Sequence, residues 1–156
     1  MTGRLVCAYR AIVSTRNFLM PKNNLRILLV EDHPFQLIAT QILLNNQGYY
    51  RLTPVLSAAE AMLAMDTSTE PFDLLLCDQC LPDLMGLELI ELANQRNLID
   101  RAVLLSGLSD DQLKLLEQHA RQRRLPLLGC LSKPLEVQAL TDLLADAGFL
   151  VNSGPL

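Results

Sequence analysis

The sequence predicts an α/β protein with a doubly wound, five-stranded parallel sheet and helices on both faces. Five short apolar runs alternate with five helical patterns, as is typical of right-handed β–α–β units. The central run, residues 74–77, is continuously apolar, as expected for a strand that is buried on both faces. Pro54 interrupts the second run and so places it at an edge of the sheet. The five runs are residues 25–30, 50–56, 74–77, 102–105 and 126–131.

Residues typical of helix ends lie between these runs. Pro34 suits the first turn of the first helix, and Gly48 suits its C-terminal cap. Ser57 and Ser109 are expected to cap the second and fourth helices. Asp83 is expected to cap the third helix, directly after the central strand.

The composition indicates a globular protein of one domain. The chain has 156 residues, half of them apolar and 19% charged, which argues against disorder. A net charge of −4 argues against nucleic-acid binding, and no apolar run approaches the roughly 20 residues that span a bilayer. The four cysteines lie mostly within apolar runs, as buried free thiols do, which favours a reducing compartment, the cytoplasm.

The predicted domain occupies residues 25–148, and residues 149–156 form a short tail. Residues 1–24 contain arginine and lysine without an acidic residue, and they show no strand or helix period. We interpret this segment as a disordered or non-native leader. A targeting peptide, which is also rich in arginine and poor in acids, is the alternative.

Polar residues follow four of the five predicted strands. Glu31 and Asp32 follow the first strand, Asp78 the third, Ser106 the fourth and Lys133 the fifth. Because the carboxyl ends of parallel strands meet at one edge of a sheet, we expect these side chains to share a pocket.

Three carboxylates in one pocket repel one another unless a cation lies among them. Mg²⁺ is typically held by one or two carboxylates, water and phosphate oxygens. A hydroxyl and an ammonium opposite the metal can hold further phosphoryl oxygens. The pocket therefore predicts phosphoryl transfer, with Asp78 as the nucleophile that forms an acyl phosphate.

The order and spacing of these residues resemble those of the receiver domain of two-component response regulators, the CheY-like superfamily, over residues 25–146. The matching segments are residues 28–32 (LLVED), 78–86 (DQCLPDLMG), 105–107 (LSG) and 132–134 (SKP). The resemblance implies a flavodoxin-like sheet with strand order 2-1-3-4-5. It also implies a role in bacterial phosphorelay signalling.

Residue roles follow from the resemblance. Asp78 would accept a phosphoryl group from a sensor histidine kinase or a phosphotransfer protein, with Ser106 as switch hydroxyl and Lys133 contacting the phosphoryl group. The implied cofactor is Mg²⁺ or Mn²⁺, bound by Glu31, Asp32, Asp78 and the backbone carbonyl of Cys80. Such a domain is a signalling phosphoacceptor with slow autodephosphorylation, not a metabolic enzyme. It would control a downstream protein or an effector domain and is compatible with a homodimer, while membranes and nucleic acid are not expected partners.

Two departures from the family pattern concern the switch. Cys130 stands three residues before Lys133, where the family usually has tyrosine or phenylalanine. We therefore expect the response to pass through the loop after Ser106 and the following helix, residues 107–125. The chain between Ser106 and Lys133 is also longer than is usual in the family, by an extension around residues 121–125.

Other functions stay open as alternatives. A Mg²⁺-dependent aspartyl phosphohydrolase also uses a strand-end aspartate, but it needs a second acid two positions later, where Cys80 stands. A second alternative is an N-terminal receiver part of a larger regulator, such as a cyclic-dinucleotide signalling protein. Cys77 and Cys80 formally make a C-x-x-C pair, which is typical of redox or zinc sites, but no second pair accompanies it.

Overall fold

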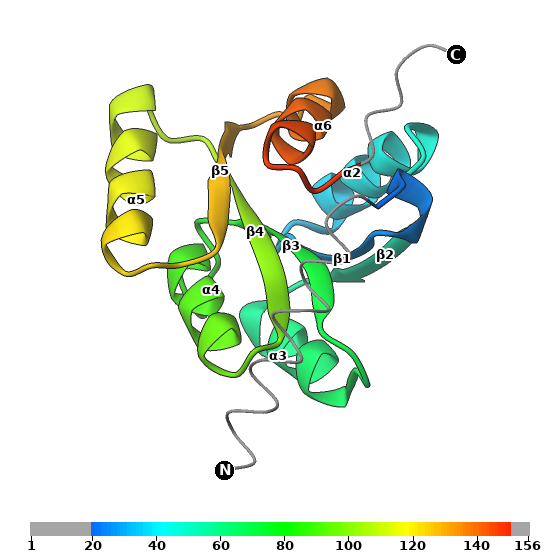
Figure 1. Cartoon of the computed structure of the whole chain (residues 1–156), viewed down its shortest axis with the longest axis horizontal. Helices are drawn as coiled ribbons and strands as arrows, with labels where there is room; N and C mark the ends of the chain where they lie inside the picture. Colours follow the sequence, from blue (N-terminus) through cyan, green and yellow to red (C-terminus); the bar gives the residue numbers. More distant parts are fainter. Residues whose placement is uncertain (1–19, 151–156) are drawn as a thin grey trace.

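The computed structural model describes residues 20–150 and confirms the predicted fold (Figure 1). The five strands form one parallel sheet in the order β2-β1-β3-β4-β5. The strands are β1 (Arg26–Val30), β2 (Arg51–Val55), β3 (Phe72–Asp78), β4 (Ile99–Ser106) and β5 (Leu127–Ser132). The helices are η1 (Lys22–Asn24), α2 (Pro34–Asn46), α3 (Ala58–Thr67), α4 (Gly86–Gln95), α5 (Asp110–Gln122) and α6 (Val137–Asp146).

Most of the expected leader, and most of the expected tail, lie outside the described residues, as does Cys7. Both segments stay predictions. Within residues 20–150, Met20 pairs with Leu150 in an isolated parallel bridge, and its backbone N–H donates to the carbonyl of Phe149. No helix in this part of the chain has the length and hydropathy needed to cross a membrane.

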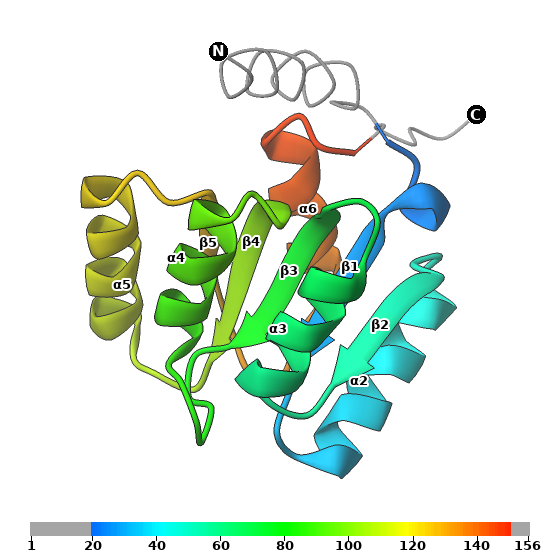
Figure 2. The same cartoon turned by 90° about the horizontal axis from the view of Figure 1, so that it is seen from below.

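Two apolar cores lie on opposite faces of the sheet. Helices α2 and α6 cover one face, and α3, α4 and α5 cover the other (Figure 2). Successive residues of β3 alternate between the cores, with Leu74 and Leu76 in one and Leu75 and Cys77 in the other. All seven residues of β3 are buried, which explains its continuous apolar run.

The two central strands are longer than their apolar runs. β3 begins two residues before Leu74 and includes Asp78, and β4 begins at Ile99. Both strands have a neighbour on each side, so backbone pairing continues beyond the apolar residues. Pro54 lies on β2, an edge strand, as predicted.

Most predicted helix ends are confirmed, but the prediction for Asp83 is wrong. The Ser57 hydroxyl accepts from the backbone N–H of Glu60, Ser109 forms a capping box, and Gly48 follows α2 with φ of +95°. Helix α4 begins only at Gly86, with Met85 at its N-cap and no side-chain cap. Asp83 instead accepts hydrogen bonds from the start of α3, because the loop after β3 folds back across that helix end.

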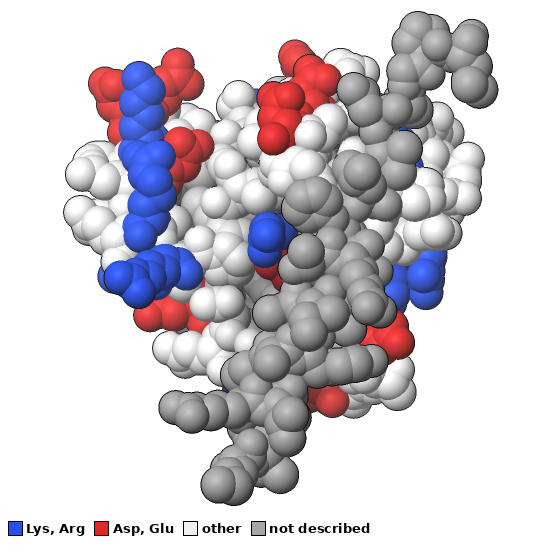
Figure 3. All heavy atoms as spheres, in the orientation of Figure 1, with Lys and Arg blue, Asp and Glu red and all other residues white. Residues whose placement is uncertain are grey.

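Helix α5 carries charges that match its dipole. Asp110 and Asp111 lie in its first turn, and His119 and Arg121 lie in its last. Figure 3 shows basic side chains gathered along this helix with acidic ones around its start. The residues of the predicted extension end this helix and turn into β5, where Arg124 has φ of +55°.

Asp73 is a buried carboxylate at the start of β3, at the end of the sheet remote from Asp78. Its Oδ2 accepts a hydrogen bond of 2.8 Å from the backbone N–H of Arg26 on β1. Burial raises the pKa of Asp73, and this effect outweighs the Arg26 hydrogen bond. The ionised side chain is therefore a net cost to folding at neutral pH.

We expect Asp73→Asn to match or exceed the wild-type free energy of unfolding at pH 7, since asparagine keeps an acceptor for Arg26 and loses the charge. The folded pKa lies above the unfolded value of about 3.9, so the advantage should shrink as the pH falls towards about 4. Asp73→Ala leaves the Arg26 N–H without its partner and should cost about 1–3 kcal/mol. Urea denaturation measures both variants, and equal losses in the two would contradict this account.

Candidate functional site

The carboxyl ends of the strands lie in register, and this places the predicted polar residues at one edge of the sheet. Val30 pairs with Cys77, so the residues that follow them, Glu31 and Asp78, leave adjacent strands side by side. Ser106 pairs with Ser132, the residue before Lys133. Glu31 and Asp78 are both buried, and so is Ser106. The parallel register therefore gathers residues from four strand ends.

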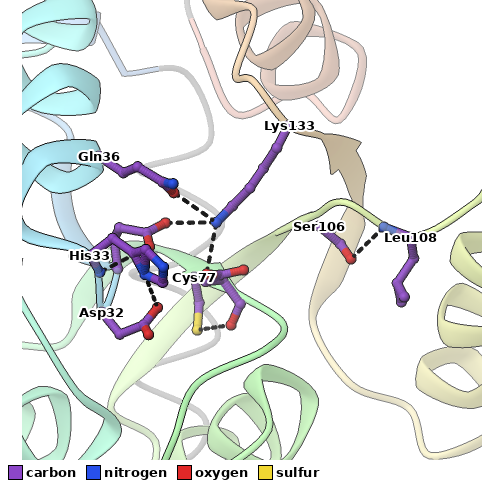
Figure 4. A network of polar contacts seen from close by, with 9 residues as sticks. Asp32, His33, Gln36, Cys77, Ser106, Leu108 and Lys133 are labelled. Atoms are coloured by element: carbon purple, nitrogen blue, oxygen red, sulfur yellow. Dashed lines mark hydrogen bonds and ion pairs between the residues drawn. The ribbon is translucent and has the colours of Figure 1, made fainter.

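Lys133 joins two of the carboxylates (Figure 4). Its Nζ donates to Asp78 Oδ2 at 2.7 Å and to Glu31 Oε2 at 2.8 Å, and lies 3.4 Å from Gln36 Oε1. Burial lowers the pKa of Lys133, but the hydrogen bonds and charges of Asp78 and Glu31 outweigh it and raise the pKa. Lys133 is therefore the cation that compensates two buried carboxylates.

Asp32 has no such compensation. Its Oδ1 is buried and accepts no hydrogen bond from any described residue. The Nδ1 atom of His33 lies 3.2 Å from this oxygen, but the orientation is not that of a hydrogen bond, and the contact is an ion pair only when the exposed imidazole is protonated. An oxygen atom that is buried without a partner is well placed to bind a cation.

The donor set fits a hard divalent cation. Glu31, Asp32 and His33 place ligand atoms within 4.8 Å of one another. Asp78 is not one of these three residues, but it shares the Lys133 ammonium with Glu31, so three carboxylates lie near one lysine. Carboxylate oxygens are the ligands that Mg²⁺ and Mn²⁺ prefer.

Within residues 20–150, no hydrogen bond or ion pair joins Ser106 or Cys80 to these carboxylates. The Ser106 Oγ accepts a hydrogen bond of 3.1 Å from the backbone N–H of Leu108, and Figure 4 shows the two residues apart from Lys133. Cys80 has an exposed side chain and pairs through its backbone with Met85 in the loop after β3. The structure thus brings Glu31, Asp78 and Lys133 into contact, whereas the Ser106 hydroxyl is hydrogen-bonded to Leu108.

Two residues outside the predicted donor set lie near the site. Gln36 contributes its amide oxygen to the surroundings of Lys133, and the His33 backbone N–H donates to Glu31 Oε1 at 3.2 Å. Pro34 was the available signal, because a helix that begins at Pro34 carries Gln36 in its first turn, at the edge where β1 ends.

The cysteines near the site do not have the properties of a redox pair. Cys77 is fully buried, and burial, followed by the charges of Asp78 and Glu31, raises the pKa of its thiol. A reactive dithiol needs the opposite, a thiol with a lowered pKa. Burial also raises the pKa of Cys130 to about 12, with a smaller contribution from Glu117.

We expect Lys133→Met to lower the free energy of unfolding by about 1–3 kcal/mol at pH 7 without divalent ions, because two buried carboxylates lose a charged donor. The raised pKa means that this stabilisation is fully present below about pH 10.4 and is lost as the pH rises through the folded value. Asp78→Asn added to Lys133→Met should recover part of the loss. Lys114→Met, on exposed α5, is the control in urea denaturation, and an equal loss there would contradict a role for the ion pairs.

Comparisons with known proteins agree with this architecture. No curated protein matches the chain. A receiver domain of an HD domain-containing protein from Pseudomonas fluorescens is 27% identical, with a TM-score of 0.62 over 79% of this chain and 93% of that one. A CheY-like receiver domain from Methylobacillus flagellatus is 25% identical, with a TM-score of 0.57 over 79% and 98%. The beryllofluoride-activated DrrB receiver domain, at 22% identity and a TM-score of 0.60 over 79% and 96%, shares the fold.

A family model provides the remaining evidence. The response regulator receiver domain model matches residues 27–145, from within β1 to within α6. That span contains every residue of the sheet except Arg26, and every residue of the acidic pocket. The chain therefore belongs to the response regulator receiver domain family, which acts in two-component signalling.

Proposed function

We propose that Asp78 accepts a phosphoryl group from a sensor histidine kinase or a phosphotransfer protein. The observation that carries this proposal is the buried Asp78 carboxylate held by Lys133 at 2.7 Å, at the end of the central strand. An Asp78 oxygen attacks the phosphorus atom and forms the new P–O bond. The P–N bond of the donor phosphohistidine breaks, and the imidazole nitrogen leaves and takes up a proton. The Lys133 ammonium, already beside Asp78, can then turn to a phosphoryl oxygen.

Glu31, Asp32, Asp78 and the backbone carbonyl of Cys80 would hold Mg²⁺ or Mn²⁺. The unpartnered Asp32 Oδ1 and the excess of carboxylates over ammonium groups support this assignment. A bound divalent ion supplies charge neutralisation for the phosphoryl oxygens. The chain contributes the oriented carboxylates and keeps the nucleophile buried.

The conformational response would begin at Ser106. Its hydroxyl oxygen is bound to the Leu108 N–H, so movement of the hydroxyl towards a phosphoryl group breaks that hydrogen bond and frees the loop before α5. Cys130 cannot act as an aromatic switch, but its backbone N–H donates to Glu117 Oε1 of α5 at 3.1 Å. Both contacts support a route through residues 107–125.

The face next to the site suits an apolar protein partner. Helix α2 exposes an apolar stripe of Phe35, Ile38 and Ile42, with Phe35 88% exposed. A separate groove, between neighbouring residues of α2 and the Lys133–Pro134 segment, opens beside Glu31. A phosphodonor must bring its histidine to Asp78, so we assign this stripe to docking of the kinase. The described cysteines are free thiols, which supports a reducing compartment such as the cytoplasm. A sensor histidine kinase would meet the protein there.

Asp78→Asn should abolish phosphoryl uptake from acetyl phosphate in the presence of Mg²⁺, because the amide is not a nucleophile. Asp73→Asn is the matched control, since Asp73 is also buried and lies at the opposite end of the same strand. Intact-protein mass spectrometry should show the added phosphoryl group on the wild type and on Asp73→Asn, and chelation of Mg²⁺ should suppress it. Uptake by Asp78→Asn at the wild-type rate would refute the proposed function.

Phe35→Ala should slow transfer from a histidine kinase about tenfold, as expected for loss of an aromatic anchor. The rate with acetyl phosphate should not change, since Phe35 lies outside the pocket. The kinase for this experiment is found beforehand, by testing which purified sensor kinases transfer phosphate to the wild-type protein. Leu63→Ala on α3, another exposed apolar residue, is the control, and equal slowing by both variants would argue against docking on α2.

A further inference from the structure

The loop between β3 and α4, residues 79–85, has a rigid base. The Gln79 backbone N–H donates to the Leu105 carbonyl, and the Gly86 N–H donates to the Gln79 carbonyl, both at 2.9 Å. The buried Gln79 side chain also accepts from the Leu87 N–H at 3.0 Å. A Cβ atom on Gly86 would lie 2.5 Å from the Asp78 carbonyl oxygen, so the two ends of the loop touch. These contacts fix where the loop starts and ends.

The tip of the loop depends on Asp83. Its Oδ1 accepts from the Ala58 N–H at 3.2 Å, and its Oδ2 accepts from the Ala59 N–H at 3.0 Å. The hydrogen bond from Ala59, followed by that from Ala58, lowers the pKa of Asp83, so the carboxylate stays charged at neutral pH. Leu81 is buried, but the polar contact of the tip with α3 is made by Asp83.

Helix α3 has an N-cap of its own, so capping this helix is not the whole role of the Asp83 contact. Ser57 already caps this helix and accepts from the Glu60 N–H at 3.1 Å. Asp83 satisfies two further N–H groups from a distant part of the chain, 25 and 24 residues along the sequence. Its distinctive effect is therefore to tether the loop to a helix that packs against the sheet.

We propose that Asp83 is a positioning residue for the metal site, which orients the Cys80 backbone carbonyl towards the cation. This proposal rests on the proposed function, in which that carbonyl is a ligand. The Cys80–Met85 bridge and the buried Leu81 hold the peptide that follows Cys80 within the loop, and Asp83 fixes where the loop lies relative to α3. Gln79 holds this segment on one side, and Asp83 holds it on the other through α3.

The experiment compares Asp83→Ala with Ser57→Ala. Both variants remove an acceptor from the first turn of α3, but only Asp83→Ala releases the loop. Amide chemical shifts of Asp78 and Cys80, followed during titration with MgCl₂, give the dissociation constant. We expect Asp83→Ala to weaken Mg²⁺ binding about tenfold, as loss of a residue that orients a metal ligand does, and Ser57→Ala to leave it unchanged. Asp83→Asn, which keeps one acceptor oxygen, should lie between them.

A second measurement separates positioning from chemistry. Phosphorylation by acetyl phosphate should need more Mg²⁺ for half-maximal rate in Asp83→Ala, but it should reach the wild-type rate at saturation. Equal Mg²⁺ affinity in Asp83→Ala and Ser57→Ala would overturn the role of Asp83 while Mg²⁺ binding by the wild type still upholds the proposed function. If Asp83→Ala does not fold, Asp83→Asn against Ser57→Ala decides the question. Absence of saturable Mg²⁺ binding by the wild type would overturn both proposals.

Discussion

The repulsion among carboxylates at one edge of the sheet is the constraint on which the site depends. Parallel strands bring Glu31, Asp32 and Asp78 to the same edge, where Glu31 and Asp78 are buried. Lys133 forms ion pairs with two of these carboxylates, although it lies 102 residues after Glu31 in the sequence. The pairing exists only when β1, β3 and β5 are assembled, so site formation and sheet formation are one event. The remaining negative charge favours binding of a cation in the pocket.

The central strand connects this site to the stability of the domain. Its middle residues are apolar and alternate between the two cores, while an aspartate lies near each end. Asp73 accepts a hydrogen bond from a backbone N–H, and burial raises its pKa. Asp78 instead accepts a hydrogen bond from the Lys133 ammonium. The same residue type therefore has a structural contact at one end of β3 and a charged partner suited to chemistry at the other. The difference lies in the surrounding groups.

Separate contacts connect the three helices on one face of the sheet with the edge that carries Asp78, Ser106 and Lys133. Asp83 links the loop after Asp78 to α3, and Gln79 links its base to α4. Ser106, through Leu108, and Glu117, through Cys130, connect the edge and β5 with α5. The opposite face carries the exposed apolar stripe of α2. This division places the proposed response route on one face of the sheet and the proposed phosphodonor surface on the other.

The sequence by itself determined the elements and the composition of the pocket. Apolar runs, helix caps such as Ser57 and Ser109, and polar residues at strand ends are local signals that depend on neighbouring residues and on periodicity. Resemblance to a family supplied the strand order and the site roles. Tertiary structure decided which groups meet: Lys133 binds both Glu31 and Asp78, Ser106 turns to Leu108, and Asp83 reaches α3 instead of capping α4. Asp83 shows the physical reason, because a carboxylate beside a helix start looks like a local cap in the sequence. Only the folded chain reveals that Gly86 packs against the Asp78 backbone. Helix α4 therefore begins at Gly86, three residues after Asp83, and Asp83 binds the start of α3.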